Sequence, residues 1–191
     1  MDVRFLIPNF CIAEVFAVFE KYRWGRTWNK HVKPAHVLTP REFAKARQHF
    51  GTAIHNGAKI LQVELNRYHI LCVDLVSPIN NAYKIKRDRG AKKNVTPAKT
   101  YDVLIVAMSV WLKNQYGEGS FTLVTGDERM QLVVERAKSA RISRPMKMHL
   151  TEMAQRVGLQ YGRDLYPTVI NLTSGGKSVL RERFADWAPA W

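Results

Sequence analysis

The chain has few cysteines and no long apolar run. Cys11 and Cys72 are its only two cysteines among 191 residues, and neither stands in a Cys-X-X-Cys or Cys/His metal-binding spacing. No segment approaches the roughly 18 apolar residues of a membrane span, and the N-terminus lacks the charged-then-apolar pattern of a signal peptide. These features argue against a disulfide framework and a membrane anchor, and we expect a cytoplasmic protein.

Acidic residues are also scarce. Asp and Glu total 16 against 30 Lys and Arg, which gives a formal net charge of +14. Because the sequence has no low-complexity basic tail, we expect the folded body itself to be positive. Such a body attracts polyanions, since each neutralised phosphate releases counterions. The charge favours nucleic acid as the partner, and an acidic protein is the alternative.

The patterns of two enzyme classes are missing. None of the six histidines stands four residues from another with a glutamate nearby, as in zinc proteases. Ser174-Gly-Gly-Lys-Ser resembles the end of a phosphate-binding loop, but Asn171 stands where that pattern requires glycine. Both zinc proteolysis and nucleotide binding of this kind are therefore disfavoured.

Strand-like and helix-like segments alternate along the chain, which predicts an α/β fold with a mostly parallel sheet covered by helices. The length and a hydrophobic content of 46% fit one main domain, residues 1–140, with a C-terminal extension, residues 141–191, packed on it. The segment 60–75 is either a hairpin or a helix that leads into a strand. Strands are predicted at 3–7, 121–124 and 168–172, and helices at 11–22, 40–50, 78–85, 101–114 and 128–138.

Three carboxylates stand in apolar surroundings. Glu14 lies in a helix that is apolar on nearly all sides, Asp102 opens an apolar helix, and Asp127 follows a buried strand and Gly126. A buried carboxylate without a partner is costly, so each needs a cation or a proton. Their structural alternatives are a salt-bridged glutamate, a helix cap and a turn aspartate. Taken together, three converging carboxylates suit a divalent cation, because such cations prefer oxygen ligands. A bound cation can activate water as the nucleophile, so the reaction needs no cysteine or serine nucleophile from the protein.

Three segments around these carboxylates resemble the acidic motifs of PIN domains: IPNFCIAEV at 7–15, TYDVLIVAM at 100–108 and LVTGDERM at 123–130. The resemblance implies a three-layer α/β/α sandwich with a mostly parallel central sheet. It also implies that Glu14, Asp102 and Asp127 surround Mg²⁺ or Mn²⁺ in a nuclease that acts on RNA. Thr125 matches the small hydroxyl residue of the family's motif, and Asn9 is a further supporting candidate.

The sequence departs from the family at its first strand, which normally carries an aspartate well ahead of the glutamate. Nothing precedes Glu14 far enough to fill that place. One alternative aligns residues 5–12 with the first strand, which puts Pro8 in the aspartate position and makes Glu64 the candidate glutamate. The other is that the strand is missing because Met1 is not the true start or the chain is truncated, with 168–172 filling the gap.

Two functions follow from the resemblance. The first is a divalent-metal-dependent endoribonuclease that hydrolyses RNA phosphodiester bonds, either alone or as the toxin of a toxin–antitoxin pair with an acidic antitoxin-like partner. The second is a non-catalytic RNA-binding relative that lacks a complete metal site. Homodimers are common in the family, so we expect one here. The basic residues expected to contact RNA lie in two predicted surface loops and are Arg26, Lys30, Lys86, Arg87, Lys92 and Lys93.

Overall fold

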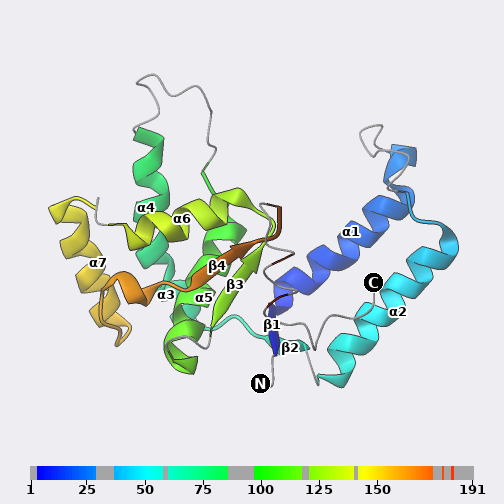
Figure 1. The fold of residues 1–191 in the computed structure, drawn as a ribbon, viewed down its shortest axis with the longest axis horizontal. Helices are drawn as coiled ribbons and strands as arrows, with labels where there is room; N and C mark the ends of the chain where they lie inside the picture. Colours follow the sequence, from blue (N-terminus) through cyan, green and yellow to red (C-terminus); the bar gives the residue numbers. More distant parts are fainter. Residues whose placement is uncertain are drawn as a thin grey trace. The chain divides into compact units, whose positions relative to one another are not determined.

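The chain folds into two compact units, Met1–Leu65 and Asn66–Trp191, each of which combines helices with one pair of parallel strands (Figure 1). The computed structural model describes residues 4–28, 37–57, 60–85, 97–117, 121–139, 142–173, 178 and 182, without the side chains of 25–28 and 83–85. The α/β class predicted from the sequence is confirmed. No helix among these residues has the length and apolar character needed to cross a bilayer.

The first unit runs strand, helix, helix, strand. Its elements are β1 (Phe5–Pro8), α1 (Asn9–Trp28), α2 (Pro40–Asn56) and β2 (Ile60–Val63). The two strands pair in parallel, with Phe5 opposite Ile60 and Pro8 opposite Val63. Helix α1 continues to Trp28, beyond the end predicted at residue 22.

Helix α2 begins where its capping signal predicts. The Thr39 hydroxyl accepts the backbone N–H of Glu42 at 3.2 Å, and the Glu42 carboxylate accepts the backbone N–H of Thr39 at 2.8 Å. This reciprocal capping box satisfies two donors that the first turn would otherwise leave unpaired. The helix extends beyond the predicted end at Phe50 and stops at Gly57, whose φ of 60° is a conformation that glycine adopts readily.

The predicted burial of α1 on nearly all sides is wrong. Phe16 and Phe19 of α1 pack edge to face against Phe50 of α2, with ring centroids 5.4 and 5.9 Å apart. Val18 is nevertheless 44% exposed, and Glu14 is also exposed. Helix α2 therefore covers one stripe of α1, and the apolar composition of the remaining surface does not imply burial.

The second unit contains the remaining helices and strands. Its elements are α3 (Arg67–Leu71), α4 (Val73–Ile85), α5 (Thr100–Tyr116), β3 (Thr122–Thr125), α6 (Glu128–Lys138), α7 (Arg144–Arg156), the short 3-10 helix η3 (Arg163–Leu165) and β4 (Thr168–Asn171). Both alternatives for residues 60–75 are wrong, because β2 is followed by α3 and α4. The Asn66 side chain caps α3 by accepting the N–H groups of Tyr68 and His69, and Pro78 lies inside α4 instead of opening it.

Helix α5 lies at the centre of this unit and contacts α3, α4, α6 and β3. Val106, Ala107 and Val110 are fully buried, which confirms that the helix opened by Asp102 is too apolar to lie on the surface. The predicted strand at 168–172 is confirmed as β4, which pairs in parallel with β3. Figure 1 shows these two strands side by side.

Candidate functional site

Asp127 lies just beyond the carboxyl end of β3, as the sequence predicts. It is the N-cap of α6, and its Oδ1 accepts the backbone N–H of Arg129 at 2.8 Å. The hydroxyl of the buried residue Thr125 accepts the backbone N–H of Asp127 at 3.0 Å, so Thr125 fixes the backbone that carries this carboxylate. Gly126 is not required by the turn, because its φ is not positive and an added Cβ would meet no atom within 4 Å.

Asp102 lies in the first turn of α5. The helix begins at Thr100, one residue before the predicted start at residue 101, and Lys99 is its N-cap. Oδ2 of Asp102 reaches back to accept the backbone N–H of Lys99 at 2.9 Å. A carboxylate in this place also interacts favourably with the helix dipole. Both aspartates therefore cap helices as well as being candidate ligands.

Arg129 brings Asp102 and Asp127 together around one cation. Its Nε lies 2.9 and 3.0 Å from the two carboxylate oxygens of Asp127, and its terminal NH2 also donates to Asp127. The same NH2 lies 3.4 Å from Oδ2 of Asp102. The side chains of Asp102, Asp127 and Arg129 are 18%, 25% and 29% exposed. We call Asp102 and Asp127 the carboxylate pair.

Neighbouring cationic side chains keep the carboxylate of Asp127 ionised. The hydrogen bonds from the Arg129 side chain lower the pKa of Asp127, and the nearby charge of Lys99 adds to this effect. The same hydrogen bonds raise the pKa of Arg129, with a smaller contribution from Asp102. The Asp127 carboxylate is therefore ionised at neutral pH and already neutralised by a guanidinium.

One further polar residue at this edge of the sheet, Asn171, was not among the site residues predicted from the sequence. Asn171 ends β4, lies opposite Thr125 in the strand register and is 5% exposed. Its amide donates to the Gln131 side chain at 2.8 Å, and its carbonyl accepts the backbone N–H of Thr173 at 2.9 Å. The signal for Asn171 was its place at the end of a predicted strand, because parallel strands bring their carboxyl ends to one edge.

No protein-family model, curated protein or solved structure matches this chain. The donor chemistry of the carboxylate pair nevertheless fits a hard divalent cation. Mg²⁺ binds through one or two carboxylates and completes its shell with water and phosphate oxygens, and Mn²⁺ also prefers oxygen ligands. Within the described residues no hydrogen bond reaches Oδ1 of Asp102. A metal at the carboxylate pair would have to replace the guanidinium of Arg129.

The third carboxylate stays a prediction. Glu14 belongs to the first unit, whereas Asp102 and Asp127 belong to the second. Among the residues that the structure describes, no group of three or more Asp, Glu, His or Cys side chains is placed to hold a metal ion. Asn9 and Glu64 each directly follow the last paired residues of β1 and β2, Pro8 and Val63. The alternative alignment with Glu64 places residues 5–12 on the first strand, whereas β1 ends at Pro8 and residues 9–12 begin α1.

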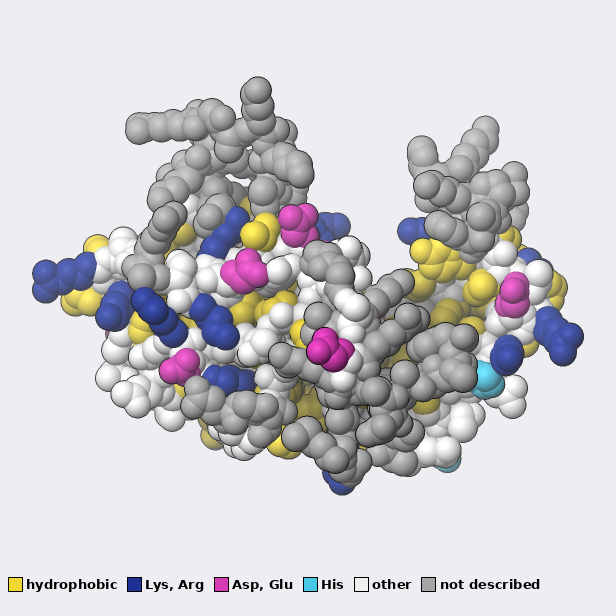
Figure 2. All heavy atoms as spheres, viewed as in Figure 1, with side chains coloured by type: hydrophobic (Ala, Val, Ile, Leu, Met, Phe, Trp, Pro, Cys, Tyr) yellow, Lys and Arg dark blue, Asp and Glu magenta, His cyan; other side chains and the backbone are white. Residues whose placement is uncertain are grey.

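The predicted RNA-binding residues fall outside the described side chains. Arg26 belongs to α1, but its side chain is not described, and Lys30, Lys86, Arg87, Lys92 and Lys93 lie outside the described residues. Figure 2 shows Lys and Arg side chains over a broad area of the second unit, with Asp and Glu side chains set among them. Trp24 is 48% exposed, and the Arg23 guanidinium lies 4.1 Å from its ring centroid, so an exposed aromatic face and a cation lie together here. Single-strand binders use such pairs to stack bases.

Proposed function

We propose that the chain is a divalent-metal-dependent endoribonuclease of the PIN type, which hydrolyses RNA phosphodiester bonds. The observation that carries the proposal is that Asp102, in the first turn of α5, and Asp127, at the N-cap of α6, both contact the guanidinium of Arg129. The formal net charge of +14 supports a polyanionic substrate. Neither cysteine supports a nucleophilic role, because burial raises the pKa of Cys11 to about 11 and that of Cys72 to about 12.

The carboxylate pair would hold Mg²⁺ or Mn²⁺, which, when bound, activates water and neutralises charge on the scissile phosphate. The Thr125 hydroxyl holds the backbone of Asp127 by accepting its N–H, and the backbone N–H of Lys99 donates to the carboxylate of Asp102. Arg129, once displaced from the carboxylates, offers a planar fork of donors that suits a phosphate group. Glu14 is the predicted third carboxylate, and Glu64 is its alternative.

The proposal extends to architecture and partners. A three-layer α/β/α sandwich with a mostly parallel central sheet is supported by the parallel pairing within both strand pairs. We also propose a cytoplasmic homodimer. If the chain is the toxin of a toxin–antitoxin pair, its acidic partner would mask the positive surface, and purification from the native host would recover a small acidic protein.

A non-catalytic RNA-binding protein is the second candidate. Arg129 favours it, because a guanidinium that holds both oxygens of Asp127 occupies the position that a metal would need. If this ion pair is permanent, RNA binding depends on the basic surface alone. Binding would then fall steeply with salt and be indifferent to Mn²⁺.

A cleavage assay on labelled single-stranded RNA tests both candidates. We expect cleavage in Mn²⁺ that stops in excess chelator and falls at least about 100-fold in Asp102→Asn and Asp127→Asn, since loss of outer-sphere support alone commonly costs a metal site 10- to 100-fold. Glu152→Gln is the matched control, because Glu152 is exposed and pairs with Arg156 on α7. Parallel Glu14→Gln and Glu64→Gln variants identify the third carboxylate.

The outcomes separate the candidates. Equal cleavage by the wild type, Asp102→Asn and Asp127→Asn would contradict the nuclease proposal. Salt-sensitive RNA binding without cleavage, unchanged by Mn²⁺, would establish the second candidate in its place.

A further inference from the structure

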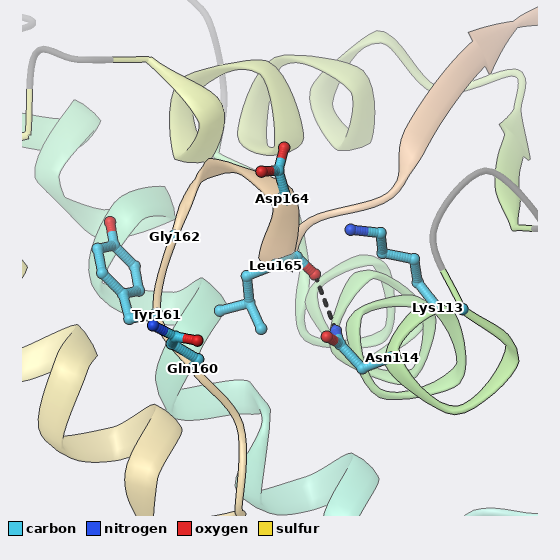
Figure 3. A pocket seen from close by; sticks show the side chains of 8 residues that line it. Lys113, Asn114, Gln160, Tyr161, Gly162, Asp164 and Leu165 are labelled. Carbon is cyan, nitrogen blue, oxygen red and sulfur yellow. Dashed lines mark hydrogen bonds between the residues drawn. The ribbon is translucent and has the colours of Figure 1, made fainter.

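A pocket of about 420 Å³ lies within the second unit, between the C-terminal part of α5 and the segment around η3 (Figure 3). Lys113 and Asn114 line it from α5, and Tyr161 and Asp164 line it from the opposite segment. Figure 3 shows the Lys113 side chain extending from α5 toward the segment that carries Asp164 and Leu165. The volume falls within the range of pockets that hold small molecules.

Lys113 is the unusual residue of this pocket. The residue as a whole is only 8% exposed, yet no hydrogen bond or ion pair joins its side-chain ammonium to another residue that the structure describes. Its neighbour Asn114, in contrast, donates to the carbonyl oxygens of Val110 at 2.8 Å and Leu165 at 3.1 Å. A lysine is seldom this buried unless its ammonium is paired. Because Lys113 lines the pocket, a ligand in the pocket can reach the ammonium and supply the counter-charge that the described side chains do not.

Asp164 does not supply that partner. It is exposed and lines the same pocket, but no ion pair joins it to Lys113. Lys113 also lies in the last turn of α5, where a cation interacts favourably with the helix dipole. A lysine on the exposed side of α5 would interact with the helix dipole equally well. The dipole therefore does not explain why Lys113 is buried beside the pocket.

We propose that this pocket binds a small polar molecule through its oxyanion, a phosphate or a carboxylate, which pairs with the ammonium of Lys113. Asp164 accepts hydrogen bonds from hydroxyl or amine groups of the same molecule, and the half-buried ring of Tyr161 packs against its body. Lys113 follows Asp102 by eleven residues in α5, which is about 16 Å along the helix axis. The pocket is therefore separate from the carboxylate pair, and its occupancy does not depend on nuclease activity.

Binding is tested with three probes: inorganic phosphate, AMP and citrate, each titrated at constant ionic strength set with sodium chloride. The readout is the backbone amide spectrum of the ¹⁵N-labelled full chain. We expect at least one probe to give saturable shifts at Gly117 and Gly162, which line the pocket. Phosphate and AMP acting without citrate would identify a phosphate ligand, and citrate acting alone would identify a carboxylate.

Two variants give the specificity control. Lys113→Met keeps the apolar stem and removes the charge, whereas Lys147→Met removes an exposed lysine of α7. We expect Lys113→Met to bind the effective probe at least tenfold more weakly and to melt at a higher temperature without ligand. Lys147→Met should bind like the wild type. Absence of saturable shifts in the wild type for all three probes, or equal binding by Lys113→Met, would overturn the proposal.

Discussion

Replacement of Arg129 by glutamine is expected to raise the affinity of the carboxylate pair for Mn²⁺. In the wild type the guanidinium donates to both oxygens of Asp127 and lies 3.4 Å from Asp102, so a metal must break these interactions before it binds. The glutamine side chain keeps a hydrogen-bond donor but carries no charge. The variant therefore removes the competing cation and leaves both carboxylates in place.

The size of the effect follows from the exposure of the three side chains. A hydrogen bond to a charged group contributes roughly 1.5–3 kcal/mol when shielded from water. Because the three side chains are 18–29% exposed, solvent screening reduces the total for the cluster to about 1–2 kcal/mol. A metal that no longer displaces this interaction should bind about 5- to 30-fold more tightly. Without metal, the variant should lose the same amount of unfolding free energy, about 1–2 kcal/mol.

Isothermal titration with Mn²⁺ measures the affinity, and urea unfolding without metal measures the stability. Arg156→Gln is the matched control, because Arg156 pairs with Glu152 on the exposed side of α7, and its Mn²⁺ affinity should equal that of the wild type. An Arg129→Gln variant that binds Mn²⁺ no better than the wild type would refute the reasoning. In that case the guanidinium does not occupy the metal position.

Three further predictions concern stability. The pKa of Asp127 is lowered in the folded state, so the ionised carboxylate stabilises the fold above its unfolded pKa of about 3.9. This stabilisation is lost as the pH falls through the folded pKa. In Asp127→Asn, the free energy of urea unfolding should therefore fall less steeply below about pH 4 than in the wild type. Tyr166→Phe removes a buried hydrogen bond of 2.8 Å to the Leu75 carbonyl and should lower the free energy of unfolding by about 1–3 kcal/mol in the same assay. Unchanged stability of this variant would contradict the prediction. Leu150→Ala empties a fully buried position in α7 and should cost about 2–5 kcal/mol; a loss below about 1 kcal/mol would show that this core collapses around the space.

The sequence correctly predicted helices and strands that depend on residues close together in the chain. Thr39, Pro40 and Glu42 place the start of α2 correctly, because a capping box is made by residues three apart. The apolar run after Asp102 predicts the buried helix α5, and the short strand before Asp127 predicts β3 and the start of α6. These features depend on spacing and composition, which the sequence shows directly.

Features that depend on side-chain choice or tertiary contact were not predictable in this way. The segment 60–75 was left open between a hairpin and a helix leading into a strand, and the structure has neither because Asn66 caps α3. Asparagine serves turns and helix caps through the same side-chain carbonyl oxygen, so its presence does not distinguish them. The interpretation of Glu14 as buried failed because only one stripe of α1 is covered by α2. The role of Arg129 depends on the approach of α6 to α5, which its place in the sequence does not reveal.

The measurement that most directly tests the central claim is anomalous diffraction from crystals of the full chain grown with Mn²⁺. The account predicts a manganese peak between the carboxylates of Asp102 and Asp127, with the guanidinium of Arg129 moved away from Asp127. Crystals saturated with Mn²⁺ that show no peak at the carboxylate pair, and Arg129 still bound to Asp127, would contradict it.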